Sequence, residues 1–436
     1  MSSTPTLDTS ISILGPQKIP SHLPYRTWAD DHPIIPLYLD AEVSEDAPGG
    51  IVELEAAGPR QHLYFDPTRA KCAIVTCGGL CPGINDVIRA IVMEAFHAYN
   101  VPAIMGIRYG LEGFIQRYGH LPMELTPARV TDIHRFGGTI LGSSRGPQSA
   151  EEIVDSLERS NISVLFVIGG DGSMKAALSI SREIRNRGLR ISVIGIPKTI
   201  DNDINFIPQS FGFDTAVGKA TEAIECAHTE AGGMPNGIGL VKLMGRESGF
   251  IAAQATLALK QVNFTLVPEA PFELEGPAGL LPALEQRLKD RGHAVIVVAE
   301  GAGQHLMDHR SDATDASGNA VLGDVADLLR RSIAAYMKRR GVTYNLKYID
   351  PSYMIRSVPA TSTDKVYCGF LGQHAVHAAM AGRTDMVVCK IQDRFVHLPL
   401  ELVTRRRRKL DVHSELWRAV LESTGQGMMY GMLPQE

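Results

Sequence analysis

The sequence predicts an α/β fold in which two domains each contain a mainly parallel β-sheet between layers of helices. Three observations favour this class. From residue 71 onward, short β-rich apolar segments alternate with segments of helical periodicity, and glycine-rich turns follow several of the apolar segments. The chain of 436 residues is also too long for one ordinary core, since a domain typically has about 150 residues. We therefore expect two domains.

The composition is typical of a globular protein without a membrane span. Hydrophobic residues make up 44% of the chain and charged residues 21%, and no apolar run approaches the ~18 residues that a membrane helix needs. A formal net charge of −5 gives no long-range attraction to nucleic acid or anionic lipid, so any anionic ligand must be held by local groups. Neither a membrane nor a nucleic acid is an expected partner.

The two ends of the chain and its cysteines favour a cytoplasmic location. No basic residue precedes Lys18, so the N-terminus lacks the charged region of a secretion signal, and the C-terminal LPQE matches no retention or peroxisomal signal. Six cysteines in so long a chain fit no dense disulfide framework and indicate a reducing compartment. We expect these thiols to be structural.

The first elements of the chain read as an extension followed by a strand and a helix. Residues 1–70 are rich in proline and acidic residues without sustained periodicity, so we expect an extension packed on the main body. The segment CAIVTCGG, residues 72–79, is a short apolar run stopped by glycines, and residues 84–96 carry apolar side chains at helical spacing. Together they predict a strand, a turn and a helix.

The clearest unit begins at the sequence GPQSAEEIVDSLERS. Ser149 and Glu152 have the spacing of a helix capping box, and residues 162–168 predict a buried strand. A helix over about 173–187 and a further strand over 191–196 follow. Strand, helix and strand at this spacing predict a parallel pair with a right-handed crossover.

Three glycine-containing or polar turns should meet at one edge of the first sheet. They are CGGLCPG, IGGDGS and IPKTIDND, and each follows a predicted strand. In parallel sheets, ligands bind beyond the carboxyl ends of the strands. The later segments IGLVKLMG, FTLVPEA and AVIVVAEGAG repeat the pattern and predict a second α/β layer system.

The basic run RRRRK, residues 405–409, resembles a nucleic-acid patch only superficially. It has no interleaved aromatic residues, belongs to a chain of net negative charge and continues into an amphipathic segment through Trp417. We interpret it as a solvated helix end.

The turn GGDGS combines phosphate-binding features with one carboxylate. Gly169, Gly170 and Gly172 allow close approach of the backbone to a ligand, and the helix that follows offers N–H groups to an anion. A carboxylate would repel phosphate unless a cation lay between them, and Mg²⁺ is commonly held by one or two carboxylates together with phosphate oxygens. Asp171 is therefore a candidate magnesium ligand; a plain tight turn with Asp171 as the helix cap is the alternative.

The next turn, PKTIDNDI, adds two more carboxylates. Asp201 and Asp203 are two residues apart, so in an extended conformation both would point the same way. One could serve as a base and the other help to hold the metal, as phosphoryl transfer to an alcohol requires; solvated turn aspartates are the alternative. Three arginines each follow an apolar segment, where a guanidinium could bring positive charge to the cleft. They are Arg145, Arg246 and Arg356.

Seven motifs, in order, resemble those of the phosphofructokinases. They are CGGLCPGINDVIR, GGTILGSSRG, IGGDGS, PKTIDNDI, LMGRESGFIA, VVAEG and YMIR, and the resemblance covers roughly residues 71–400. It implies two Rossmann-like three-layer α/β domains with mainly parallel sheets. Residues 71–213 with about 354–403 would form the ATP-binding domain, and residues 214–353 with about 404–436 the fructose-6-phosphate-binding domain and a C-terminal helix.

The resemblance also implies roles for individual residues. The phosphoryl donor would be bound by Gly79, Arg145, Gly146, Gly170, Asp171, Gly172 and Ser173. Asp201 would be the base, Thr199 and Arg246 would complete the catalytic set, and Mg²⁺ would lie at Asp171 and Asp203. The sugar phosphate would be bound by Thr199, Ile200, Asp201, Met244, Gly245, Arg246, Glu300, Lys347, Tyr353, Met354, Ile355 and Arg356.

The sequence departs from the simplest ATP-dependent members of the family at three positions. Gly237 and Lys347 stand where those members carry arginines, and Tyr353 stands where they carry a histidine. Lys347 is a candidate to replace one phosphate contact, and Lys242 is a candidate for another. The family implies an allosteric homo-oligomer, a dimer or a tetramer, but the lost arginines belong to its intersubunit site, so that allosteric scheme does not transfer.

Gly172 and Lys198 bear on the choice of phosphoryl donor. The simplest ATP users have glycine at position 198, whereas pyrophosphate users have lysine there and a second aspartate at position 172. A carboxylate at 172 would occupy the passage of a nucleotide's α-phosphate, whereas Lys198 excludes nothing. We therefore expect ATP:D-fructose-6-phosphate 1-phosphotransferase activity in glycolysis, with Mg²⁺ and ATP.

Two other functions stay open. One is pyrophosphate-dependent transfer, and the other is a regulatory, non-catalytic subunit, which would be expected to lack the base or the metal ligand. Asp171, Asp201 and Asp203 are all present, which favours an active enzyme. Sedoheptulose 7-phosphate also stays open as a secondary acceptor.

Overall fold

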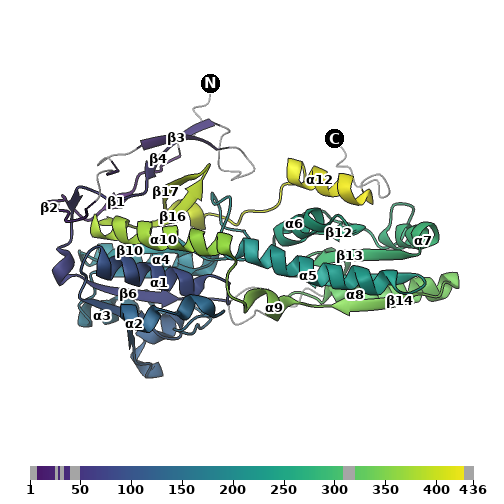
Figure 1. The fold of residues 1–436 in the computed structure, drawn as a ribbon, viewed down its shortest axis with the longest axis horizontal. Helices are drawn as coiled ribbons and strands as arrows, with labels where there is room; N and C mark the ends of the chain where they lie inside the picture. The colour runs from purple at the N-terminus through teal and green to yellow at the C-terminus, as the bar shows by residue number, and fades with distance from the viewer. Residues whose placement is uncertain (1–6, 25–27, 30–33, 40–49, 308–319, 427–436) are drawn as a thin grey trace. The chain divides into compact units, whose positions relative to one another are not determined.

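The computed structural model describes the chain except for residues 1–6, 25–27, 30–33, 40–49, 308–319 and 427–436. The chain divides into two compact units. Unit 1 consists of residues 1–212 and 356–408, and unit 2 of residues 213–355 and 409–436. Each unit has its own sheet and its own helices (Figure 1).

Unit 1 is built on a nine-stranded sheet in the order β3-β4-β17-β16-β10-β9-β6-β7-β8. The strands are β3 (Ile34–Leu39), β4 (Gly50–Ala56), β6 (Lys71–Thr76), β7 (Ala103–Ile107), β8 (Met123–Glu124), β9 (Val164–Gly169), β10 (Ser192–Pro197), β16 (Met386–Ile391) and β17 (Arg394–Pro399). The five central strands, from β16 to β7, pair in parallel, and the strands outside them are antiparallel to their neighbours. The predicted parallel pair of residues 162–168 and 191–196 is therefore confirmed as β9 and β10.

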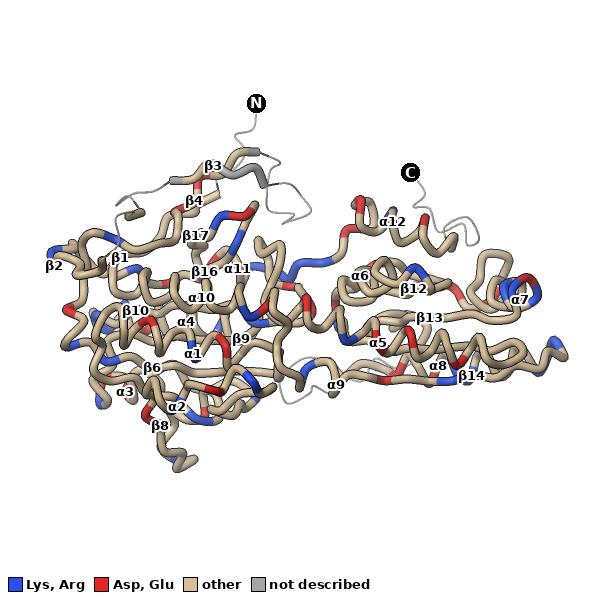
Figure 2. Tube along the Cα trace, in the orientation of Figure 1, with Lys and Arg blue, Asp and Glu red and all other residues tan. Residues whose placement is uncertain are grey.

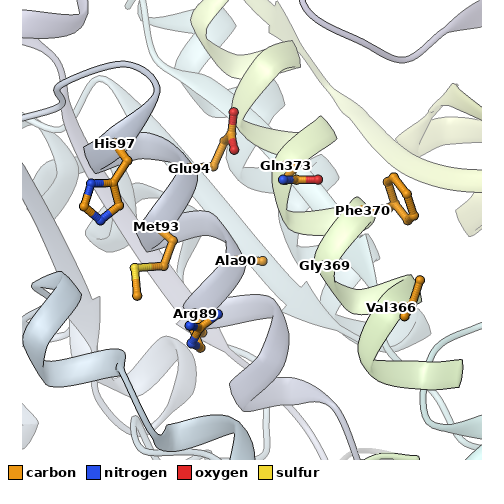
Figure 3. Close-up of a pocket in the computed structure, with 9 residues that line it drawn as sticks. All are labelled: Arg89, Ala90, Met93, Glu94, His97, Val366, Gly369, Phe370 and Gln373. Carbon is orange, nitrogen blue, oxygen red and sulfur yellow. The ribbon is translucent and has the colours of Figure 1, made fainter. Parts of the chain in front are cut away.

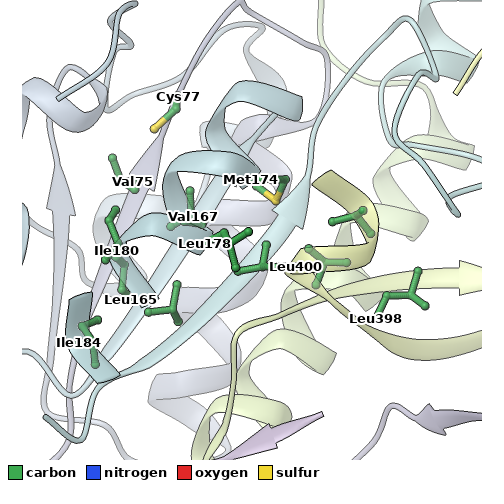
Figure 4. Close-up of a cluster of buried hydrophobic side chains, with 14 of the residues drawn as sticks. Val75, Cys77, Leu165, Val167, Met174, Leu178, Ile180, Ile184, Leu398 and Leu400 are labelled. Atoms are coloured by element: carbon green, nitrogen blue, oxygen red, sulfur yellow. The ribbon is translucent and has the colours of Figure 1, made fainter. Parts of the chain in front are cut away.

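Helices cover the sheet of unit 1 and bury its central strands. They are α1 (Ile84–His97), α2 (Pro127–Val130), α3 (Ala150–Arg159), α4 (Asp171–Asn186), α10 (Ser362–Met380) and α11 (Leu400–Thr404). Helix α1 packs against α10, and α4 packs against α3 and α11. Alternate residues of the strands, such as Val75, Leu165 and Val167, meet Met174 and Leu178 of α4 in one apolar cluster (Figure 4). Strands buried in this way explain the near-continuous apolar runs of the sequence.

The predicted helix starts agree with the structure to within two residues. Ser149 is the N-cap of α3, because its hydroxyl accepts a hydrogen bond from Glu152 N at 3.2 Å. Helix α4 begins at Asp171, two residues before the expected start, and ends at Asn186 before Gly188, which has φ of 66°. Asp171 thus lies in the first helical turn, beside the end of β9.

The N-terminal extension contributes strands to unit 1. Strand β4 joins the main sheet by pairing with β17, where Ala56 lies opposite Val396. A small antiparallel pair ties the extension further, β1 (Ser12–Ile13) with β15 (Arg383–Thr384). A second pair, β2 (Ile19–Pro20) with β5 (His62–Leu63), joins two parts of the extension itself. The expected packing of the extension on the main body is confirmed for its described residues, although the periodicity of the sequence gave no sign of these strands.

Unit 2 is a second three-layer α/β unit. Its parallel sheet has the order β12-β13-β11-β14. The strands are β11 (Gly237–Leu243), β12 (Phe264–Leu266), β13 (His293–Ala299) and β14 (Asn345–Ile349), and the helices are α5 (Phe213–Gly232), α6 (Phe250–Leu259), α7 (Leu280–Arg291), α8 (Val325–Arg340), α9 (Ser352–Arg356) and α12 (Glu415–Thr424). Helices α5 and α6 pack together, α7 packs with α8, and both α5 and α7 contact β13. The prediction of two α/β layer systems with mainly parallel sheets is confirmed.

The arginine run is not a solvated helix end. Helix α11 stops at Thr404 before the run, which appears in blue between the labels α11 and α12 in Figure 2. Arg406, Arg407 and Arg408 are half-buried, whereas Arg405 and Lys409 are exposed. The interpretation is wrong for the central arginines because their backbone is held against the loop at residues 202–208, rather than continuing a helix into solvent.

No helix of the described residues is long and apolar enough to cross a membrane.

Candidate active site

Three turns of unit 1 meet beyond the carboxyl ends of β6, β9 and β10. Cys77 N donates to Ile168 O at 2.9 Å, and Lys198 N donates to Gly169 O at 2.9 Å. The ammonium of Lys198 links the outer turns, since its Nζ donates to Gly79 O at 2.7 Å. The expected meeting of CGGLCPG, IGGDGS and IPKTIDND is confirmed.

A fourth turn, residues 137–146, joins this group. The hydroxyl of Ser143 donates to Gly78 O at 2.6 Å, which ties the turn to the one after β6. Arg145 is exposed, and its Nη2 lies 4.0 Å from the place that a Cβ on Gly79 would occupy. The predicted donor-binding residues Gly79 and Arg145 therefore lie together.

The glycines beside Asp171 leave the start of α4 open. Gly170 is the N-cap residue of α4, and its carbonyl accepts a hydrogen bond from Ser173 N at 2.9 Å. A Cβ on Gly172 would meet no atom within 4 Å, so packing does not require glycine there. Gly146 has φ of 101°, a conformation that other residues rarely adopt. The helix N-terminus and its open approach fit a bound phosphate.

Lys198 is a buried cation at the centre of the turns. Its side chain is only 5% exposed, and burial lowers its pKa. The neighbouring acidic groups of Cys81, Cys77, Asp201 and Asp203 act in the opposite direction because they favour the charged ammonium. Lys198 therefore lies within electrostatic reach of two of the three predicted catalytic or metal-binding carboxylates.

Asp171 is held by only one of its two carboxylate oxygens. Oδ2 accepts a hydrogen bond from Lys175 Nζ at 2.9 Å and lies 3.4 Å from Arg407 Nε. Oδ1 is buried and has no hydrogen-bond partner among the described residues. A buried carboxylate oxygen without a partner is costly unless a ligand satisfies it. This orphaned oxygen fits the role of a cation ligand.

Asp203 provides the second carboxylate of the candidate metal site. Its Oδ1 accepts a hydrogen bond from Thr199 Oγ1 at 2.9 Å. Burial raises the pKa of Asp203; the Thr199 hydrogen bond and the charge of Arg407 oppose this rise, and the charge of Asp171 adds to it. The two carboxylates therefore repel each other, and a divalent cation would relieve both burial and repulsion.

Asp201 and Asp203 are arranged by a turn, not by an extended strand. Asn202 between them has φ of 56°, so the expected alternation of an extended segment is wrong here. The Asn202 amide stabilises the turn by donating to Pro208 O at 2.9 Å and accepting from Ser210 N at 2.9 Å. Asparagine tolerates the left-handed conformation, which explains this residue type at this position.

The donor set fits Mg²⁺ if the nucleotide supplies the remaining ligands. No group of three or more His, Cys, Asp or Glu side chains that could hold a metal occurs in the described part of the chain. Mg²⁺ usually keeps several waters and takes one or two carboxylates together with phosphate oxygens. Asp171 and Asp203, with the orphaned Oδ1, match that pattern.

Unit 2 positions its predicted substrate residues in two interlocked turns. Met244, Gly245 and Arg246 follow β11, and Glu300 follows β13. Gly301 N donates to Gly245 O at 3.1 Å, and a Cβ on Gly301 would lie 1.8 Å from Arg246 O. The two turns therefore pack backbone against backbone.

The remaining predicted sugar-phosphate residues lie in or near β14 and α9. Lys347 is half-buried in β14. Tyr353 and Met354 of α9 are exposed, at 76% and 70%, and Arg356 is half-buried. Ile355 is fully buried, so its side chain belongs to the core and only its backbone can face a ligand.

Lys242, the candidate for a further phosphate contact, and Gly237, one of the family departures, both lie in unit 2. Lys242 Nζ lies 3.0 Å from Asp350 Oδ2 and 3.7 Å from Asp324 Oδ1. Burial lowers the pKa of Lys242, but the hydrogen bond and charge of Asp350 outweigh burial and raise it overall. At Gly237, a Cβ would lie 2.1 Å from Ala231 O, so this backbone leaves no space for the arginine of other members.

A surface pocket of unit 1 lies apart from the predicted site residues. It has a volume of about 390 Å³ and lies between α1 and α10 (Figure 3). Its lining consists of Arg89, Ala90, Met93, Glu94, His97, Val366, Gly369, Phe370 and Gln373. None of these residues belongs to the glycine turns.

Sequence reasoning missed Arg407, which contacts Asp171. The two residues are 236 positions apart, and the run around Arg407 carries no motif of the family series. The available signal is a dense cluster of arginines at residues 405–408, which the sequence analysis interprets as a solvated helix end.

Comparison with known proteins identifies the family. Residues 71–379 match the phosphofructokinase family, and an ATP-dependent 6-phosphofructokinase of Amycolatopsis methanolica is 52% identical over 383 residues, covering 86% of this chain and 83% of the relative. The chain belongs to the phosphofructokinase family. An ATP-dependent 6-phosphofructokinase of Borreliella burgdorferi is 50% identical, covering 86% of this chain and 85% of that protein.

Solved structures of phosphofructokinases share the fold. The pyrophosphate-dependent phosphofructokinase of Marinobacter aquaeolei matches with a TM-score of 0.67 and 22% identity, covering 81% of this chain and 91% of that one. The corresponding protein of Nitrosospira multiformis gives a TM-score of 0.66 at 21% identity, with the same coverage. The predicted phosphofructokinase fold is confirmed, and at this identity the likeness concerns the fold alone.

Proposed function

We propose that this phosphofructokinase transfers the γ-phosphoryl group of ATP to the 1-hydroxyl of fructose 6-phosphate, giving fructose 1,6-bisphosphate and ADP in glycolysis. The observation that carries the proposal is the set of relatives about half identical over most of the chain, which are ATP-dependent 6-phosphofructokinases. The carboxylates and glycine turns of unit 1 supply the required chemical groups.

Asp201 is proposed as the general base. It accepts the proton of the 1-hydroxyl as that oxygen forms a bond to the γ-phosphorus, and the bond from phosphorus to the bridging oxygen of ADP breaks. The Thr199 hydroxyl donates to the neighbouring Asp203 Oδ1 at 2.9 Å and accepts a hydrogen bond from Asp201 N at 3.1 Å. The turn at residues 199–203 thus holds base and metal ligand in one hydrogen-bonded unit.

Mg²⁺ held by Asp171 and Asp203 would neutralise charge on the phosphates of the bound donor. The N-terminus of α4, with Gly170, Gly172 and Ser173, is proposed to receive the phosphates, and Gly79, Arg145 and Gly146 complete the donor site.

The sugar-phosphate site is assigned from the motif resemblance. Arg246 would stabilise the transferring charge, and Glu300 would hold sugar hydroxyls, with Met244 and Gly245 shaping the turn between them. Lys347 and Arg356 would bind the 6-phosphate with the segment Tyr353–Ile355, in which Ile355 contributes through its backbone.

Donor choice is proposed to depend on Gly172. A side chain there would enter open space at the start of α4, where a carboxylate would add negative charge and bulk to the path of a nucleotide. Lys198 is shared with pyrophosphate users but is occupied in the protein by its hydrogen bond to Gly79 O. Pyrophosphate dependence stays the second candidate because of Lys198.

An assay of the purified protein with each donor tests the proposal. We expect turnover with ATP and Mg²⁺, little with pyrophosphate, and a loss of about 10²–10⁴-fold in kcat for Asp201→Asn. Turnover with pyrophosphate alone would exclude the ATP assignment. Activity that is absent in the wild-type protein with both donors would instead favour a non-catalytic subunit.

The assembly and location remain as expected from the sequence. We propose a homo-oligomer, a dimer or tetramer, in the cytoplasm. Sedimentation of the purified protein measures the oligomeric state.

A further inference from the structure

The arginine run after α11 lies against the turn that carries Asp203, a contact for which the proposed mechanism has no role. Arg407 pairs with Ile204 in an antiparallel bridge, and Arg408 N donates to Asp203 O at 2.8 Å. The Arg408 guanidinium donates to Pro208 O at 2.9 Å. Backbone and side chain together fix residues 407 and 408 beside the candidate metal loop.

Arg407 brings a partly buried positive charge to the carboxylates. Its Nε lies 3.4 Å from Asp171 Oδ2, and its side chain is 20% exposed. The other cation on this oxygen, Lys175, is 52% exposed and therefore more strongly screened by water. Both cations lie on Oδ2, whereas Oδ1 is buried without a hydrogen-bond partner among the described residues. Arg407 thus compensates the charge of Asp171 through Oδ2 and leaves Oδ1 without a partner among the described residues.

We propose that Arg407 is a resident counter-cation of the Asp171 and Asp203 pair, which holds Asp171 in the metal-free protein, opposes binding of the divalent cation and attracts the phosphates of the nucleotide. The proposal rests on the assignment of these aspartates as metal ligands. Two buried like charges repel each other, so a fixed cation beside them stabilises the empty site. The same charge repels an incoming metal and favours an anionic nucleotide.

Removing this charge predicts opposite changes for the two ligands. In Arg407→Gln, Mn²⁺ should bind the nucleotide-free protein about 3- to 10-fold more tightly, and ADP in the presence of EDTA should bind more weakly by a similar factor, each about 1 kcal/mol. A purely structural role predicts another result: a loosened loop at residues 203–208 would weaken both ligands.

The experiment measures Mn²⁺ binding by electron paramagnetic resonance and ADP binding by calorimetry, on the full chain. Arg405→Gln is the matched control, because Arg405 belongs to the same run but is exposed; it removes the same net charge and should shift neither affinity by more than about two-fold. Arg407→Lys keeps the charge and should stay near the wild-type values. Arg407→Met keeps the apolar stem and gives a second charge-free variant if Arg407→Gln does not fold.

Four outcomes overturn the proposal, of which three concern changes in affinity. They are weakening of both ligands in the charge-free variants, no change in either, and the same pair of changes in Arg405→Gln. Absence of Mn²⁺ binding at millimolar concentration in both the wild type and Arg407→Gln also contradicts it.

Asp171→Asn separates this proposal from the metal assignment beneath it. Loss of Mn²⁺ binding in Asp171→Asn, with unchanged binding in Arg407→Gln, removes only the role of Arg407. Wild-type Mn²⁺ binding in Asp171→Asn removes the metal assignment and the counter-cation together.

Discussion

Unit 1 contains two buried carboxylate clusters that differ in how they are satisfied. In the first, Glu55 of β4 accepts contacts from Arg60 Nη2 at 3.2 Å, Arg383 Nε at 3.0 Å and His397 Nδ1 at 2.9 Å. Neither oxygen of Glu55 is a buried atom that lacks a hydrogen bond. In the second, Asp171 has a buried oxygen with no partner in the described chain.

The carboxyl pKa values of the two clusters are shifted in opposite directions. Burial raises the pKa of Glu55, but the hydrogen bonds and charges of His397 and Arg383 outweigh burial and lower it to about 2. Burial lowers the pKa of His397, while its hydrogen bond to Glu55 and the charge of that carboxylate oppose the shift. At Asp203, by contrast, burial raises the pKa and the neighbouring Asp171 adds to the rise.

This difference indicates a structural role for the Glu55 cluster and a binding role for the Asp171 cluster. The Glu55 cluster ties the N-terminal extension to the sheet, because Glu55 comes from β4 while His397 belongs to β17 and Arg383 to β15. The Asp171 cluster lies at the carboxyl ends of the central strands and keeps an unsatisfied oxygen. The pairing of the Glu55 cluster is not complete, because the buried Nε2 of His397 has no hydrogen-bond partner among the described residues. The contrast therefore concerns the carboxylate oxygens: a buried one without a protein partner favours binding.

The largest effect on stability should come from removing the charge of Glu55 from its cluster. Glu55→Gln leaves two buried arginines, each 1% to 2% exposed, without their carboxylate, and should lower the free energy of unfolding by about 3–5 kcal/mol. Denaturant unfolding measures this. Glu53→Gln, on the same strand but exposed, is the control and should change stability by less than about 0.5 kcal/mol. A kcat that falls in folded Glu55→Gln would contradict the separation of the two clusters.

In the Asp171 cluster, a substitution should lower activity strongly and change stability little. Asp171→Asn should lower kcat about 10²–10³-fold, because a charged group of the donor site is lost. Its free energy of unfolding should change by less than about 1 kcal/mol, since the exposed Lys175 regains water and repulsion with Asp203 disappears. A stability loss as large as that of Glu55→Gln would refute the comparison.

Acid should lower the stability of the protein by protonating Glu55. Its pKa of about 2 in the folded chain lies below its ordinary 4.5, so ionised Glu55 contributes stability above pH 4.5 that is lost as the pH falls toward 2. The contribution is about 3 kcal/mol. The difference in unfolding free energy between wild type and Glu55→Gln should therefore shrink between pH 6 and pH 3; a constant difference would exclude this linkage.

Two glycines offer the smallest and most local contrast. Gly237→Ala should lower the stability of unit 2 by about 1–3 kcal/mol, because its Cβ would lie 2.1 Å from Ala231 O. Gly172→Ala meets no atom within 4 Å and should leave stability within about 0.5 kcal/mol of wild type. Thermal unfolding measures both, and equal losses would show that Gly172 is also required by packing.

Local features of the fold could be predicted from the sequence, because they depend on neighbouring residues. The apolar runs gave β9 and β10, and Ser149 gave the start of α3. The pairing of β4 with β17 could not be predicted, since Glu55 and His397 are 342 positions apart and local patterns do not specify which distant strands pair.

The candidate site divides in the same way. The meeting of three turns followed from the topology of parallel strands, but the turn at Asn202 and the contact of Arg407 with Asp171 depend on tertiary packing. A run of like charges carries no information about the carboxylate that it meets 236 residues away.

The cysteines set the response of the protein to oxidants. Five of the six thiols are buried, and only Cys226 is exposed. Burial raises the pKa of Cys77 and Cys81, which lie within electrostatic reach of Lys198, to about 12. Since the thiolate is the reactive form, peroxide and alkylating reagents should modify Cys226 first and leave the glycine turns of unit 1 intact. The burial that packs these turns also insulates their chemistry from changes in cellular redox state.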